Sequence, residues 1–65
     1  MGFSENFKVL RKAQKIDQKD LAKHLNVSSK TISHWETGYT EPSISQLIAI
    51  SKFFDVSIDE LVDNK

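Results

Sequence analysis

Helix N-cap signals recur at short intervals along this chain, and they constrain its fold more than any other feature. The four candidate caps are Asp17, Ser28, Ser43 and Ser57. Gln46 and Glu60 follow the last two caps at the spacing of a capping box. These signals predict five short helices, over about residues 3–15, 18–25, 29–37, 44–54 and 58–63. Because Asn-Gly and Asp-Gly turns are absent, strands are not expected, and the predicted fold class is all-α.

Apolar residues recur at helical spacing within these segments. Phe3, Phe7 and Leu10 form one stripe, and Ile32 and Trp35 form another. The segment 44–54 carries more apolar residues than one helix face can bury, namely Ile44, Leu47, Ile48, Ile50, Phe53 and Phe54. A helix of this kind is either central in the fold or partly covered by another chain.

The size and composition of the chain narrow the choice of function. Its 65 residues predict one domain, 1–65, and the lack of cysteine leaves a helical core as the source of stability. We expect no cofactor and no metal, since the chain has no cysteine and His24 and His34 are its only histidines. An enzyme is not expected, because no Asp is placed to orient a histidine beside a serine. With no membrane-length apolar run and no secretory start, the expected location is the cytoplasm.

Charge is distributed unevenly, although the formal net charge is zero. Residues 1–35 hold seven Lys or Arg against three acids, and residues 36–65 hold two Lys against six acids. The two halves therefore carry +4 and −4. This asymmetry suggests a basic face directed toward phosphate, although an accidental dipole on a solvated surface would give the same count.

The connection between segments 18–25 and 29–37 is the most informative stretch. Asn26, Val27 and Ser28 form a turn of the length found in a helix-turn-helix, with Asn26 suited to a left-handed backbone conformation. At about 100° per residue, Ile32 and Trp35 share the core face of the second helix. The opposite face is polar and free of acids, and consists of Ser29, Lys30, Ser33, His34 and Thr37. Such a face is suited to a phosphate-lined groove, although an ordinary solvated face remains the alternative.

At several positions the chain resembles one known protein family. Gln18, Ala22, Asn26, Ile32 and Trp35, followed by Glu36-Thr37-Gly38, are similar to the Cro and phage-repressor type of helix-turn-helix, also called the XRE family. Glu41-Pro42-Ser43 and the segment 54–61 resemble that family's fourth and fifth helices. Many members have Gly at the position of Asn26, and many carry Lys or Arg in the loop that here contains Tyr39 and Thr40.

The resemblance implies a compact, five-helix, lambda-repressor-like domain that binds operator DNA and regulates transcription as a repressor. Segment 29–37 would lie in the major groove. The DNA-binding residues would be Gln18, Ser28, Ser29, Lys30, Thr31, Ser33, His34, Thr37, Tyr39 and Thr40. Arg11 and Glu36 would form a structural salt bridge between the first and third helices, although an exposed pair of little energetic value is the alternative.

The partner expected from this resemblance is double-stranded DNA with a palindromic operator. A homodimer through the fourth and fifth helices is expected on two half-sites, with Phe53, Ile58 and Val62 as candidate contacts. An antitoxin or adaptor-type protein-interaction module on the same fold is the alternative function. DNA binding would weaken steeply with salt, whereas an apolar protein interface would barely respond.

Overall fold

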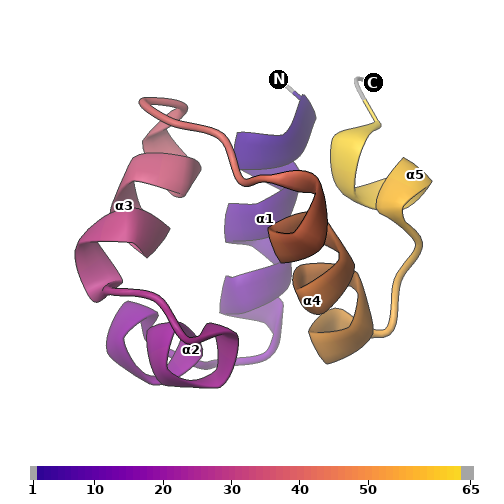
Figure 1. The fold of residues 1–65 in the computed structure, drawn as a ribbon. Helices are drawn as coiled ribbons and strands as arrows, with labels where there is room; N and C mark the ends of the chain where they lie inside the picture. Colours follow the sequence, from indigo (N-terminus) through magenta and orange to yellow (C-terminus); the bar gives the residue numbers. More distant parts are fainter. Residues whose placement is uncertain (1, 64–65) are drawn as a thin grey trace.

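A computed structural model describes residues 2–63, which form five helices with no β-strand among them (Figure 1). In chain order the helices are α1 (Gly2–Ala13), α2 (Gln18–Leu25), α3 (Ser29–Thr37), α4 (Ile44–Phe54) and α5 (Ile58–Val62). The all-α fold class is therefore confirmed. None of these helices is long and apolar enough to cross a lipid bilayer.

All four predicted N-caps are present. Asp17 accepts a hydrogen bond from the Asp20 amide at 2.7 Å, and Ser28 accepts one from the Thr31 amide at 3.1 Å. Ser43 and Ser57 begin α4 and α5 with complete capping boxes. Because each cap satisfies an amide that has no partner within its helix, the helix starts are fixed by local sequence.

Two helices end one or two residues before the approximate positions that the sequence predicts. The first helix ends at Ala13 instead of near residue 15, because Lys15 adopts a left-handed conformation with φ 56°. The fifth ends at Val62 instead of Asp63, which is extended. The side-chain amide of Asn6 donates to the carbonyls of Glu60, Leu61 and Asp63. A residue of α1 therefore supplies hydrogen bonds to carbonyl groups at the C-terminal end of α5, which lack partners within that helix.

The core lies where the five helices meet. Its buried residues are Phe7, Leu21, Ala22, Ile32, Trp35, Ile50, Phe54 and Leu61. Phe7 is central. Its ring centroid lies 5.7 Å from that of Trp35 and 6.1 Å from that of Phe54, and both pairs of rings meet edge to face. Such pairs add to the free energy gained by burial. The predicted burial of Ile32 and Trp35 is confirmed, and it orients α3.

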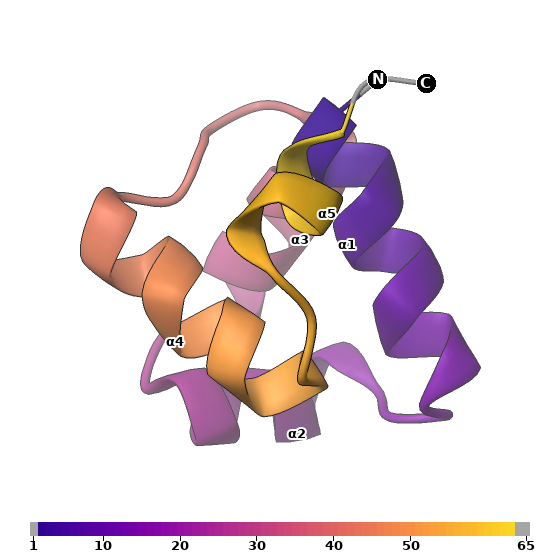
Figure 2. The same cartoon turned by 90° about the vertical axis from the view of Figure 1, so that its right-hand side faces the viewer.

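The helices place α3 and α5 on different sides of the molecule. In Figure 1, α3 lies at the left above α2, whereas α5 lies at the right beside α4. Figure 2 shows α5 crossing in front of α3 and lying next to α1. The polar face of α3 is thus left uncovered by the other described helices.

Candidate nucleic-acid interface

The polar face of α3 is accessible along its length. Ser29, Lys30 and Thr37 are exposed, while Ser33 and His34 are half-buried. Ile32 and Trp35, on the other face, are 0% and 2% exposed. The helix therefore presents hydroxyl, amine and imidazole groups outward because its two large apolar side chains are held inward.

Both ends of α3 are fixed by local geometry. At its start, Asn26 has φ 61° and ψ 42°, the left-handed conformation predicted for the turn, and Val27 packs against the core. The hydroxyls of Ser28 and Thr31 lie 3.0 Å apart. At its end, Gly38 has φ 80°, a conformation that glycine adopts without the strain imposed by a Cβ.

The loop after α3 brings two further predicted residues beside the helix. Tyr39 is 76% exposed, and Thr40 is exposed as well. The Tyr39 and His34 rings lie 4.7 Å apart between centroids. These loop residues are thus positioned next to the polar face, although they lie outside the helix itself.

Arg11 and Glu36 form an ion pair that joins α1 to α3. Arg11 Nη2 donates to Glu36 Oε1 at 3.3 Å, and Arg11 Nε donates to Glu36 Oε2. The side chains are only 13% and 4% exposed, so the alternative of an exposed pair is wrong. Arg11 also donates to the carbonyl of Ile16 at 2.9 Å, which fixes the loop before α2.

Gln18 belongs to the same network, which sequence reasoning missed. Its side-chain amide donates to Glu36 Oε1 at 3.1 Å. The structure thus places Gln18 at the start of α2 with one amide hydrogen directed to Glu36, whereas the resemblance implied a contact with phosphate. No local signal could reveal this bond, because the two residues lie on different helices and meet only in the folded chain.

The electrostatics of α3 follow from this network. Glu36 is the single acid in α3, and its buried carboxylate is occupied by Arg11 and Gln18. The exposed face of α3 therefore carries no carboxylate. In contrast, α5 begins with Asp59 and Glu60, which are exposed.

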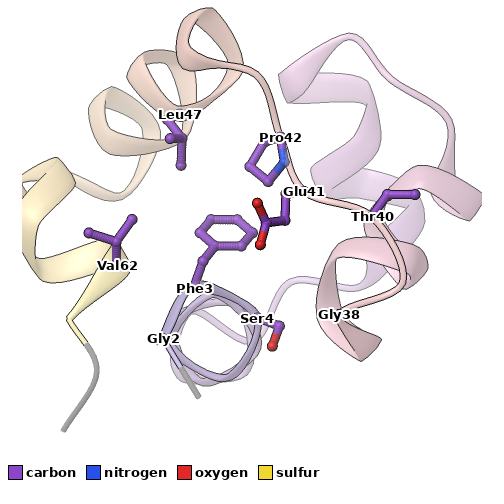
Figure 3. A pocket seen from close by; sticks show the side chains of 9 residues that line it. All are labelled: Gly2, Phe3, Ser4, Gly38, Thr40, Glu41, Pro42, Leu47 and Val62. Atoms are coloured by element: carbon purple, nitrogen blue, oxygen red, sulfur yellow. The ribbon is translucent and has the colours of Figure 1, made fainter.

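A pocket of about 440 Å³ lies between the loop that follows α3 and the start of α1 (Figure 3). Its lining consists of Gly2, Phe3, Ser4, Gly38, Thr40, Glu41, Pro42, Leu47 and Val62. Phe3 lies in the middle of the view, with Leu47, Pro42 and Val62 around its ring. No lining residue lies within α3 itself, but the pocket reaches the loop after it through Gly38 and Thr40.

Apolar side chains also remain exposed on α4 and α5. Ile44 is 76% exposed, Ile48 42% and Val62 43%. Phe53, expected at a dimer contact, instead packs partly against the core, with its ring 5.0 Å from that of Phe54. The surplus of apolar residues in segment 44–54 is therefore left mainly at Ile44 and Ile48.

Comparison with known proteins identifies similar chains. A helix-turn-helix family model matches residues 7–61. The HTH-type transcriptional activator BcrR of Enterococcus faecalis is 43% identical over 65 residues, which are 100% of this chain and 32% of that protein. The repressor protein C2 of Salmonella phage P22 is 41% identical over 58 residues, which are 89% of this chain and 27% of that protein. The chain thus spans about a third or less of these two relatives.

Solved structures give the same picture of the fold. The crystal structure of the P22 c2 repressor in complex with a synthetic operator has a TM-score of 0.92 and 37% identity, covering 100% of this chain and 98% of that one. Hydroxypropylphosphonic acid epoxidase from S. wedmorenis has a TM-score of 0.85 and 34% identity, but only 32% of that chain is covered. The same helical unit is therefore found both in a regulator and in part of an enzyme chain.

Proposed function

The chain belongs to the helix-turn-helix family of the Cro and phage-repressor type, and from this premise we propose that it binds double-stranded operator DNA and regulates transcription. The observation that carries the proposal is the uncovered, acid-free face of α3, held at both ends by a capped turn. The major groove of B-DNA is wide enough to admit an α-helix such as α3. The described residues act as a DNA-binding module, and residues 1–65 constitute one such domain without enzymatic activity, located in the cytoplasm.

The residues of α3 have distinct roles in this proposal. Lys30 donates to guanine O6 or N7, and Ser29 and Ser33 contact base edges with little discrimination. His34 donates to the same purine acceptors. Ser28, Thr31 and Thr37 lie at the flanks of this face, where short hydroxyl side chains contact phosphate or sugar.

Residues outside α3 position the helix on the duplex. Tyr39 and Thr40 contact the phosphate backbone from the loop, and Gln18 does so from the N-terminal end of α2. The Gln18 amide has a second hydrogen in addition to the one donated to Glu36, so both contacts are compatible. The P22 c2 repressor, whose fold is so similar, was crystallised with an operator, which supports this mode of binding.

The test is selection from a random duplex pool, followed by affinity measurements on the selected site at several salt concentrations. We expect the logarithm of the binding constant to fall linearly with the logarithm of the salt concentration, with a slope of about −0.9 per phosphate contacted. Binding that is insensitive to salt, or a pool without enrichment, would contradict the proposal.

A matched pair of variants at one exposed position makes this test specific to α3. Ser29→Glu keeps the helix stable, because an acid in the first turn is favourable, but it adds a negative charge to the proposed DNA face. We expect Ser29→Glu to weaken binding by more than about tenfold through like-charge repulsion. Ser29→Ala removes only a hydroxyl and is expected to retain binding within about fivefold. Equal affinities for the two variants would exclude this face.

A homodimer on two half-sites is the form that we propose for the bound state, since a family of this kind reads half-sites separated by about one helical turn. The exposed side chains of Ile44, Ile48 and Val62 are its contacts, together with the half-buried Ile58. Phe53 contributes only the part of its surface that the core leaves open.

A further inference from the structure

The turn after α3 is held largely by the carbonyl of His34, while the Gly38 amide also donates to the carbonyl of Trp35 at 3.3 Å. The Tyr39 amide donates to the His34 carbonyl at 2.9 Å, the Thr40 amide at 3.4 Å and the Thr37 hydroxyl at 3.2 Å. The left-handed conformation of Gly38 reverses the chain at this point. The loop is therefore held against the same turn of α3 that carries His34.

The side chains of this turn also meet. The rings of His34 and Tyr39 lie 4.7 Å apart between centroids and are inclined at 56°. Tyr39 is 76% exposed, whereas His34 is half-buried. Tyr39 thus covers part of the imidazole while remaining largely accessible itself.

The contact has a consequence for the orientation of the imidazole. Rotation about the bond that joins an imidazole to its Cβ is broad, so an unsupported histidine samples many ring orientations. Among residues 2–63, neither ring nitrogen of His34 has a hydrogen-bond partner. The Tyr39 ring is therefore a contact that restricts the imidazole, and neither nitrogen is committed to another group of the described residues.

We propose that Tyr39 is a positioning residue that orients the His34 imidazole and thereby sets the base preference at one position of each half-site. This inference rests on the proposed function and deepens it. Without Tyr39, the His34 ring would have to lose rotational freedom on binding. The difference in binding free energy between its preferred base and the other bases would then be smaller. Tyr39 contributes to specificity through its ring, and to affinity through its hydroxyl.

The experiment compares four variants, Tyr39→Ala, Tyr39→Phe, His34→Ala and Thr40→Ala, by random-pool selection and by affinity for the selected duplex. Tyr39→Ala is expected to lower the preference at the His34 position by about fivefold and to leave the other positions unchanged. Tyr39→Phe keeps the ring and retains the preference. Thr40→Ala, the control in the same loop, lowers affinity for all sequences without altering any preference.

The double variant His34→Ala/Tyr39→Ala separates positioning from direct contact. We expect it to have the same base preference as His34→Ala alone, because Tyr39 acts through His34. A further loss of preference in the double variant would overturn the inference, and so would an unchanged preference in Tyr39→Ala. In either case the proposed function would stand if the wild type still enriches a site.

A measurement without DNA tests the contact independently. In the NMR spectrum of the free protein, the ring protons of His34 are expected to shift when Tyr39 becomes Ala and to stay in place when it becomes Phe. Identical His34 shifts in all three proteins would overturn the inference even if duplex binding is found. Absence of duplex binding together with the expected shifts would refute the proposed function, and the specificity role of Tyr39 with it.

Discussion

Glu36 is the residue at which α1, α2 and α3 are joined. Its carboxylate accepts from Arg11 and from Gln18, and it is 4% exposed. A buried carboxylate is costly to leave unpaired, so each of these hydrogen bonds matters more than a surface contact would. At the same time, the pairing removes the one negative charge of α3 from the face proposed to meet DNA.

Replacement of Glu36 by Ala is expected to lower the free energy of unfolding by about 3 kcal/mol, because the partly buried Arg11 guanidinium loses its charge partner. Urea denaturation measures the change. Glu41→Ala, which removes an exposed carboxylate, serves as the control and is expected to change stability by no more than about 0.5 kcal/mol. Equal effects of the two substitutions would show that the ion pair contributes nothing to stability.

Lys30 is the exposed amine on the proposed DNA face. Lys30→Ala is expected to relax the base preference at one position of each half-site, with a loss of about 1–3 kcal/mol of binding free energy. Random-pool selection followed by titration of the preferred duplex checks this. If the selected sequence is unchanged and only affinity falls, Lys30 contacts phosphate and not a base.

Helix α3 shows how local sequence and core contacts jointly position an element. The caps at Ser28 and Gly38 determine where it begins and ends, while Ile32 and Trp35 determine its rotation about its axis. The turn from Asn26 to Ser28 sets its direction relative to α2. Because Asn26 is left-handed, a β-branched side chain at this position would strain the backbone.

Asn26 provides a test at the level of this element. Asn26→Ala is expected to destabilise the domain by about 1 kcal/mol, since a Cβ without a compensating polar group is strained at φ 61°. Asn26→Gly is expected to stay within about 0.5 kcal/mol of the wild type, because relief of strain is offset by greater freedom of the unfolded chain. Urea denaturation of both variants distinguishes them. A stable Ala variant would mean that the turn relaxes to another conformation.

At the scale of the whole molecule, the five helices enclose a small core centred on Phe7 and Ile50. A chain of this size buries only about 60% of the surface exposed by its unfolded form, so stability depends on every core contact. The chain also leaves Ile44 and Ile48 uncovered on α4. Association of two copies would remove that apolar surface from water.

Ile48→Glu is expected to shift the protein from dimer toward monomer, because it places a charge in the proposed interface. Sedimentation equilibrium over a range of concentrations, alone and on a palindromic duplex, gives the stoichiometry. Val9→Glu, at an exposed apolar residue of α1, is the matched control and should leave the association unchanged. If one wild-type chain binds each palindromic duplex, the proposed dimer is ruled out.

The amino-acid sequence by itself determined the starts of α2 to α5, the turn before α3 and the inward face of α3. These features depend on residues close together in the chain: a cap and the amides of the next turn, or Ile32 and Trp35 at helical spacing. The left-handed conformation at Asn26 was predictable for the same reason. The end of α1 was less so, because Lys15 carries no signal for its left-handed conformation.

Only the tertiary structure decided which residues from different helices meet. The Gln18–Glu36 hydrogen bond, the attachment of Asn6 to the end of α5 and the exposure of Ile44 and Ile48 all depend on the relative placement of helices. Their placement results from close packing of side chains around the core, where shape and volume select one arrangement. Composition and residue spacing do not specify these contacts between helices. The contacts form only when the chain folds.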